Sequence, residues 1–146
     1  MSPQHPALLD EFHVVLGDDA VRRARERIAD AAVGAGLPLS RSALADAKLC
    51  ASETITNALL HAGGECRVRV EWTGWQLRVA IADRSVRLPS VLPATVGQTT
   101  GRGLALVDAF ACSWGWESTQ LGKVVHFLIT ADEAEPPAIA AQLAAA

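Results

Sequence analysis

Apolar residues recur along the chain with two spacings, and these spacings predict where strands and helices lie. Alternation of apolar and polar residues, typical of a half-buried strand, marks several short segments. Apolar residues three or four positions apart, typical of an amphipathic helix, mark longer ones. The predicted strands span residues 11–16, 66–72, 76–82, 113–117 and 124–130, and the predicted helices span residues 20–33, 41–61 and 103–112.

Glycines and short polar residues separate these elements. Residues 17–19, Gly-Asp-Asp, break the first strand and supply capping groups for the helix that follows. Gly34 and Gly36 end that helix. Ser40 and Ser42 are both plausible caps for the second helix.

The order of the elements predicts the fold class. Hairpin connections dominate, so the sheet should be mostly antiparallel, with helices stacked on one face. We therefore expect an α+β fold, a two-layer α/β sandwich, in a single domain over residues 11–131. Residues 1–10 would be an N-terminal extension and residues 132–146 an Ala-rich C-terminal tail. Residues 83–100 hold two prolines and no sustained periodicity, which favours a long functional or disordered loop.

Composition and charge narrow the classes of function. Half of the 146 residues are hydrophobic, which is enough for a substantial core. The net charge is −3 and the basic residues are scattered, which argues against the basic stripe of a nucleic-acid-binding face. No apolar run approaches the roughly 20 residues that span a bilayer, and the N-terminus shows no secretory signal. We expect a cytoplasmic protein that binds neither nucleic acid nor membrane.

The cysteines carry no recognisable site. Cys50, Cys66 and Cys112 lie far apart in the sequence and show neither metal-ligand spacing nor a disulfide framework. We expect each to be a small core residue in a reducing cytoplasm.

The second predicted helix carries a polar ridge. Glu53, Asn57 and His61 are stacked one turn apart, opposite an apolar side. That apolar side consists of Leu44, Ala47, Ala51, Ile55, Ala58 and Ala62. The ridge is either a solvated helix face or a site. In a site, the Asn oxygen suits Mg²⁺ and the Glu one turn earlier can accept a proton. For His61, a hydrogen-bonded structural role competes with a role in the site.

Two further segments have a simple and a functional interpretation. Gly101-Arg102-Gly103 opens the third helix, where free backbone N–H groups and the helix dipole can bind phosphate. An ordinary loop-to-helix turn has the same appearance. Asp83 closes an apolar strand and could accept a hydrogen bond from an exocyclic amine, or it could simply start a turn.

These signals occur together in one order. Glu53-x-x-x-Asn57-Ala58, Asp83 at a strand end and Gly101-Arg102-Gly103-Leu104 resemble the N, G1 and G2 boxes of the GHKL ATPase superfamily, the Bergerat fold. The sequence most resembles the small anti-sigma-factor serine/threonine kinases and the related ATP-binding regulators of actinobacteria. The resemblance covers roughly residues 12–130.

The resemblance implies ATP and Mg²⁺ as ligands. Asn57 would bind Mg²⁺, Glu53 would be the catalytic base, and Asp83 would hold the adenine amine. Residues 84–100 would form the ATP lid. The cofactor-binding residues that it implies are Asn57, Asp83, Ser85, Thr100, Gly101, Arg102, Gly103 and Leu104.

The same resemblance implies protein partners. A kinase of this family transfers the γ-phosphate to a serine of a STAS-type antagonist and also binds a sigma factor. The resemblance also implies a possible homodimer. Two departures keep an alternative open: Asp83-Arg84-Ser85-Val86-Arg87 replaces the Asp-x-Gly-x-Gly of many members, and Val124 lies near a position where several carry Thr. The alternative is a non-catalytic nucleotide-binding module that regulates a protein partner.

Overall fold

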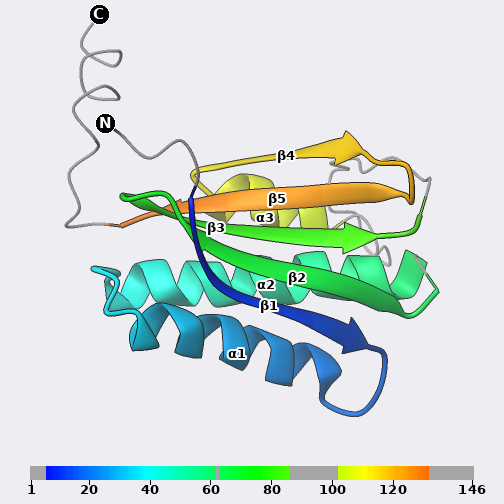
Figure 1. Cartoon of the computed structure of the whole chain (residues 1–146), viewed down its shortest axis with the longest axis horizontal. Coiled ribbons are helices and arrows are strands. Elements are labelled where there is room, and N and C mark those ends of the chain that lie inside the picture. Colours follow the sequence, from blue (N-terminus) through cyan, green and yellow to red (C-terminus); the bar gives the residue numbers. More distant parts are fainter. Residues whose placement is uncertain (1–5, 62, 86–101, 132–146) are drawn as a thin grey trace, which may run out of the picture.

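The protein folds as a five-stranded sheet with three helices on one side (Figure 1). The computed structural model describes residues 6–61, 63–85 and 102–131, and for residues 102–104 it describes the backbone only. The strands are β1 (Ala7–Val15), β2 (Glu65–Trp72), β3 (Gln76–Asp83), β4 (Ser113–Ser118) and β5 (Lys123–Thr130), and the helices are α1 (Ala20–Gly34), α2 (Arg41–His61) and α3 (Arg102–Phe110).

The sheet is antiparallel at every pairing. Its strand order is β1-β2-β3-β5-β4, so the two hairpins β2–β3 and β4–β5 join through the β3–β5 pair. In that pair Val79 lies opposite Phe127, and Asp83 lies opposite Lys123. The predicted two-layer α+β sandwich with a mostly antiparallel sheet is confirmed.

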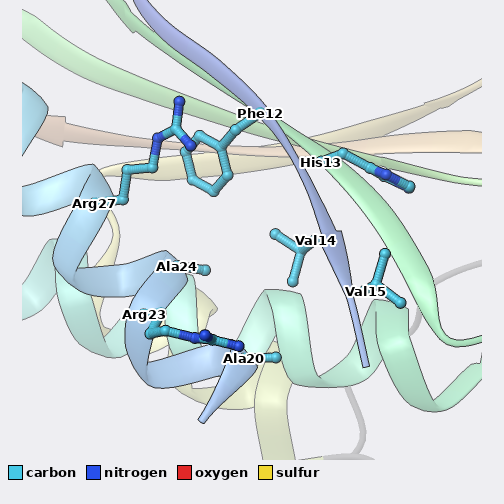
Figure 2. Close-up of a pocket in the computed structure, with 8 residues that line it drawn as sticks. All are labelled: Phe12, His13, Val14, Val15, Ala20, Arg23, Ala24 and Arg27. Atoms are coloured by element: carbon cyan, nitrogen blue, oxygen red, sulfur yellow. The ribbon is translucent and has the colours of Figure 1, made fainter. Parts of the chain in front are cut away.

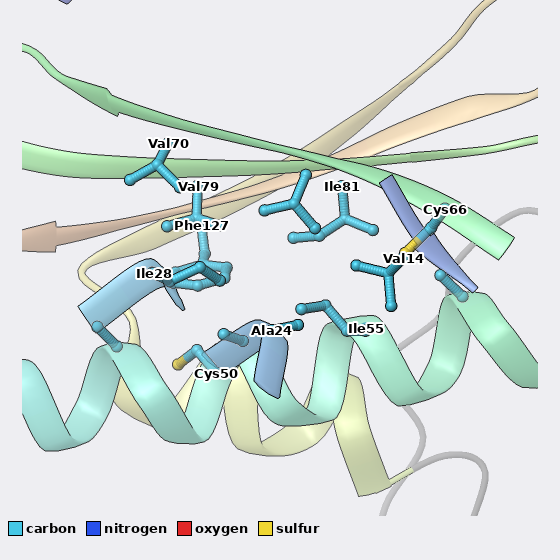
Figure 3. Packing of buried hydrophobic residues seen from close by; sticks show 14 of the residues in the cluster. Val14, Ala24, Ile28, Cys50, Ile55, Cys66, Val70, Val79, Ile81 and Phe127 are labelled. Carbon is cyan, nitrogen blue, oxygen red and sulfur yellow. The ribbon is translucent and has the colours of Figure 1, made fainter. Parts of the chain in front are cut away.

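One face of the sheet and the inner side of the helices form the core. The period of two puts Val68 and Val70 of β2 and Phe127 of β5 on the buried face. Ile28 of α1 and Ile55 of α2 pack against them from the helix layer (Figure 3). Leu77, Val79 and Ile81 of β3 complete the sheet side of this core. Burial confirms the predicted apolar side of α2 at Ala47, Ala51, Ile55 and Ala58. Leu44 is only half-buried, and Ala62 lies outside the described residues.

Strand β1 begins earlier than predicted and ends earlier too. It starts at Ala7, pairs with β2 from Trp72 onward, and has a register irregularity between Leu8 and Asp10. Asp10 is accommodated in the strand because Arg27 of α1 donates two hydrogen bonds to its carboxylate, at 2.8 and 3.0 Å. Leu16, the last residue of the predicted strand, lies outside β1 and is exposed.

The caps of the first two helices differ from each other. Asp19 has a left-handed backbone with φ 58° and makes no side-chain capping bond to α1, so the predicted capping role of Asp19 is wrong. Its carboxylate instead pairs with Arg22 at 3.0 Å. For α2, the Ser40 hydroxyl accepts a hydrogen bond from the Ala43 amide at 2.9 Å. Of the two predicted candidates, Ser40 and Ser42, it is therefore Ser40 that caps the helix.

Helix α3 stops two residues before its predicted end. The Cys112 amide donates a hydrogen bond to the Leu128 carbonyl at 2.8 Å, which begins the pairing of β4 with β5. Cys112 is exposed there, so its predicted place in the core is wrong, whereas Cys50 and Cys66 are buried as predicted. No helix in the described ranges is both long and apolar enough to cross a membrane.

Candidate functional site

The elements that carry the predicted site residues meet at one end of the molecule. Helix α2 ends there at His61, β3 ends at Asp83, α3 begins at Arg102 and β5 begins at Lys123, all on the right-hand side of Figure 1. Helices α2 and α3 pack against each other, and α2 also packs against β3 and β5. The antiparallel connectivity therefore gathers segments that lie far apart in the sequence.

Glu53 and Asn57 lie one turn apart on α2, and both are half-buried. Neither side chain makes a hydrogen bond or ion pair with another residue in the described part of the chain. Between them, Thr54 turns inward and its hydroxyl donates to the Cys50 carbonyl at 2.7 Å, which satisfies a buried threonine within the helix. A ligand-binding helix face needs polar groups that are not already bonded to the protein, and within the described part of the chain Glu53 and Asn57 meet this condition.

Two acidic residues of α2 raise the pKa of a buried thiol on the same helix. Burial raises the pKa of Cys50 to about 12, and the negative charges of Asp46 and Glu53 add to the rise. A thiol with this pKa stays protonated at neutral pH, so Cys50 is a core residue and not a nucleophile.

Asp83 ends β3 on the buried face of the sheet and is held by two neighbours. Its Oδ1 accepts hydrogen bonds from the Ser85 amide at 2.8 Å and from Lys123 Nζ at 3.0 Å. Its Oδ2 accepts a second bond from Lys123 Nζ at 2.9 Å. The side chains of Asp83 and Lys123 are only 2% and 6% exposed. Asp83 also lies near Cys66, whose pKa is raised to about 12 by burial and then by this negative charge.

Sequence reasoning missed Lys123, although a signal was present. Lys123 begins an alternating run in which Val125, Phe127 and Ile129 face the core. Extending the period of two back by one step places the lysine on the buried face, where a cation needs a partner. The antiparallel pairing of β3 with β5 supplies Asp83 as that partner.

Gly122 allows this pairing because it lies against the end of β3. A Cβ atom at Gly122 would lie 2.6 Å from the Arg84 Cα atom and would overlap the Asp83 carbonyl oxygen. Only a residue without a side chain fits at this point of the β4–β5 turn. The close contact fixes the start of β5, and with it Lys123, beside Asp83.

Several predicted site residues stay predictions. Thr100 and Gly101 lie outside the described residues. Arg102, Gly103 and Leu104 form the first turn of α3, but only their backbone is described. Ser85 contributes its amide to Asp83, and His61 lies half-buried in the last turn of α2. The predicted convergence of Asn57 with the amides of residues 101–104 on one cavity is thus untested.

Two large cavities border these residues. One, of about 550 Å³, lies at the ends of β2, β3 and β5, and Asp83, Arg84, Ala82 and Val124 are among its lining residues. The other, of about 500 Å³, lies along the outer side of α1 and α2, and Lys48, Leu49, Ser52 and Glu53 are among its lining residues. Neither contains Asn57.

A smaller cavity lies between β1 and α1, away from the predicted site. It measures about 180 Å³, and Figure 2 shows its lining residues, with Arg27 over the ring of Phe12. The Arg27 guanidinium carbon lies 4.4 Å from the ring centroid, a cation–π distance. None of the predicted site residues that the structure describes lines it.

The described residues form no metal site of their own. They contain no group of three or more His, Cys, Asp or Glu side chains that could hold a metal ion. Magnesium typically takes one or two protein ligands and completes its shell with water and phosphate oxygens. The half-buried Asn57 amide fits such a role, since it has no hydrogen-bond partner among the described residues.

Comparison with known proteins adds independent observations. Residues 16–129 match the family described as histidine kinase-like ATPase domain. The anti-sigma F factor of Pasteuria penetrans is 33% identical over 117 residues, which cover 70% of this chain and 78% of that protein. An uncharacterised protein of Streptomyces coelicolor is 38% identical over 71 residues, which cover 45% of this chain and 68% of that protein.

Among solved structures, the crystal structure of the RsbU and RsbW domains of a Mycobacterium tuberculosis protein shares the fold, with a TM-score of 0.59 and 19% identity. The match covers 83% of this chain, which spans about a third (32%) of that longer one. At this identity the likeness concerns the fold alone.

Proposed function

Because this chain belongs to the histidine kinase-like ATPase domain family, we propose that it is an ATP- and Mg²⁺-binding regulator that controls a protein partner. The family match implies ATP binding. The similarity to an anti-sigma F factor supports a sigma factor as one partner. We further propose a serine/threonine kinase activity that acts on a STAS-type antagonist and is coupled to sequestration of the sigma factor.

The observation that carries the proposal is the meeting of α2, β3 and α3 at one end of the sheet. Asn57 and Glu53 lie on α2, about one and two turns before its end at His61, and offer an amide and a carboxylate that have no protein partner among the described residues. The first turn of α3 brings backbone N–H groups and the positive end of the helix dipole. This set suits a triphosphate and its metal ion.

Each side chain has a defined task in the proposed reaction. Asn57 would hold Mg²⁺, which neutralises phosphate charge when bound. The amides at the start of α3 would hold phosphate oxygens. Glu53, one turn from Asn57, would accept the proton of the attacking serine hydroxyl. Because phosphoryl transfer needs little covalent help, positioning and charge neutralisation would supply most of the rate.

Glu53→Gln separates catalysis from binding. The change keeps the size of the side chain and removes the base, so ATP affinity should stay the same while phosphoryl transfer falls by roughly 10²- to 10⁴-fold. The assay is the gain of a phosphoryl group, by mass spectrometry, on a STAS-domain protein that binds this chain. Asp30→Asn is the matched control, because Asp30 is exposed on α1 and makes no ion pair within the described part. Equal transfer by Glu53→Gln would rule out the role of Glu53.

The second candidate is a non-catalytic module in which bound nucleotide only sets the conformation for a partner. The segment Asp83-Arg84-Ser85-Val86-Arg87 favours it, since it lacks the glycines of the Asp-x-Gly-x-Gly that many family members carry. This candidate predicts nucleotide binding by calorimetry without transfer to the same STAS-domain protein.

A further inference from the structure

The cavity of about 550 Å³ at the ends of β2, β3 and β5 opens on the face of the sheet turned away from the three helices (Figure 1). The antiparallel register places Arg67, Ala82 and Val124, which all line it, in one row across these strands. Val68 and Ile81, their neighbours along the chain, are buried in the core, so the period of two directs the row to the opposite face. The sheet therefore separates this cavity from the helix layer, which carries the predicted magnesium ligand and base.

The turn between β4 and β5 forms one wall of the cavity. Thr119, Gln120 and Leu121 of this turn are among the lining residues. The Thr119 amide donates to the Gly122 carbonyl at 2.9 Å, and the Gly122 amide donates to Thr119 Oγ1 at 3.0 Å, which closes the turn. Gly122 itself lies against the backbone at the end of β3. The wall is therefore held in place before a ligand arrives, which lowers the entropic cost of binding.

Two arginines line this cavity without a protein partner in the described part of the chain. Arg67 and Arg84 are both exposed, and neither makes an ion pair or a side-chain hydrogen bond with another described residue. By contrast, Arg69 and Arg78 on the same face are bound by Glu71, at 3.1 and 2.7 Å. The cavity therefore offers two guanidinium groups whose donors are free to bind an anion.

The carboxylates at the cavity do not cancel this charge. The buried Asp83 borders the cavity, but its carboxylate is bound by Lys123 and is directed to the other face of the sheet. Glu65 also lines the cavity, and its Oε2 lies 3.6 Å from Nε2 of His13. Because Lys123 neutralises Asp83, both arginines stand against Glu65 alone, and the cavity favours an anion.

The remaining part of the cavity is largely apolar. Ala82 and Val124 lie between the arginines and the turn, and the side chain of Leu121 in the turn is 74% exposed. A large exposed aliphatic side chain beside two free cations suits a ligand with an anionic head and an apolar body. The volume lies within the range of roughly 300–1,000 Å³ that small-molecule sites have.

We propose that this cavity binds a small organic anion, a carboxylate with an apolar body. Arg67 and Arg84 hold the carboxylate, and Ala82, Leu121 and Val124 contact the apolar body. The inference goes beyond the proposed function, since it concerns a second ligand on the opposite face of the sheet and requires no nucleotide.

The test uses octanoate as the probe, titrated into the isotope-labelled full chain without nucleotide and followed by backbone amide chemical shifts. We expect saturable changes at Arg67, Ala82, Arg84 and Leu121, with a dissociation constant on the order of 1 mM. Octylammonium has the same chain length and the opposite charge. It should bind more weakly by at least roughly tenfold, since it loses the charge-assisted hydrogen bonds.

Three variants separate the charged from the apolar contacts. Arg67→Met combined with Arg84→Met keeps the apolar stems and removes both charges, so the affinity for octanoate should fall by at least roughly tenfold. Leu121→Ser removes the apolar wall and should weaken octanoate binding several-fold. Arg41→Met is the matched control, because Arg41 is exposed at the start of α2 and makes no ion pair within the described ranges. All four positions are exposed, so the amide spectrum without ligand should show an intact fold in each variant.

The outcomes distinguish this inference from the proposed function. Octanoate binding at these amides that the double variant loses and Arg41→Met keeps supports the inference. Equal affinity for octylammonium, unchanged affinity in the double variant, or changes confined to other surfaces overturns it. If octanoate moves none of these amides but the double variant weakens binding of a STAS-domain protein, the cavity docks a protein and the inference fails. None of these results bears on ATP binding, which is measured separately.

Discussion

Gly122 shows how strongly a single residue constrains the site. The turn between β4 and β5 touches the backbone at the end of β3, and a Cβ atom there would lie 2.6 and 2.7 Å from the Arg84 Cα and carbonyl carbon. Backbone atoms cannot move aside as a flexible side chain can, so a larger residue must displace the start of β5.

Gly122→Ala should therefore destabilise the fold by about 1–3 kcal/mol, the usual cost of overpacking. Chemical denaturation followed by circular dichroism measures it. Gly34→Ala is the matched control, because no atom lies within 4 Å of the Cβ position at the last residue of α1. That change should be neutral or stabilise the fold by up to about 1 kcal/mol, since alanine favours a helix over glycine. Equal effects of the two changes would contradict the contact at Gly122.

His126 gives the fold a dependence on pH. It lies on the uncovered face of β5 over Gly115, where a Cβ atom would come within 3.0 Å of its ring. Burial and the charge of Arg78 lower the pKa of His126, and Glu117 opposes this shift. Because the folded state binds this proton less readily than the unfolded state, the contribution to stability is complete above the ordinary histidine pKa of about 6.5 and declines as the pH falls below it.

His126→Gln should remove this part of the pH dependence. Melting temperatures measured at about pH 8 and about pH 5 would fall less on acidification in the variant than in the unmodified protein. Glu117→Gln, which removes the opposing charge, should enlarge the fall. The attribution to His126 fails if the variant and the unmodified protein lose stability equally.

At the scale of single residues, the sequence predicted groups with a distinctive chemistry and missed those defined by pairing. Asp83 could be identified because it closes an apolar strand. Lys123 could not be assigned to it, because the β3–β5 pairing joins residues 40 positions apart. Cys112 was placed in the core by residue type alone, whereas its position at the β4 edge leaves it exposed.

At the scale of elements, α2 was predicted with its observed bounds, Arg41–His61. Two local signals define this helix: the spacing of its apolar residues and the pair Gly63-Gly64 that follows its end. Both glycines have a positive φ, which a helix cannot continue through. The early start of β1 was missed because Asp10 is polar, and its place in the strand depends on Arg27 of another element. Elements with local signals were thus predictable, and those completed by distant partners were not.

The start of α2 also gives a prediction. Ser40→Ala removes the hydroxyl that accepts from the Ala43 amide, and should cost about 1 kcal/mol of stability. Ser42→Ala, at an exposed position two residues later, should change stability by less than about 0.5 kcal/mol. The two variants can be compared by urea denaturation. A larger loss for Ser42→Ala would show that the cap has been assigned to the wrong serine.

At the scale of the whole molecule, the fold places the end of α2, the end of β3, the start of α3 and the start of β5 together (Figure 1). The predicted fold class is confirmed. It could be predicted because hairpin connections leave few other arrangements of the strands. The predicted site stays a prediction, since residues 86–101 lie outside the described part of the chain.

The measurement that addresses the central claim is a map of backbone amide chemical shifts on addition of ATP with Mg²⁺, by NMR spectroscopy of the full chain. The account predicts the largest changes around Asn57, at Asp83 to Ser85, in the first turn of α3 and at Lys123, with a smaller response when Mg²⁺ is withheld or Asn57 is changed to Ala. Changes confined to the cavity between β1 and α1, or no changes at millimolar nucleotide, would contradict it.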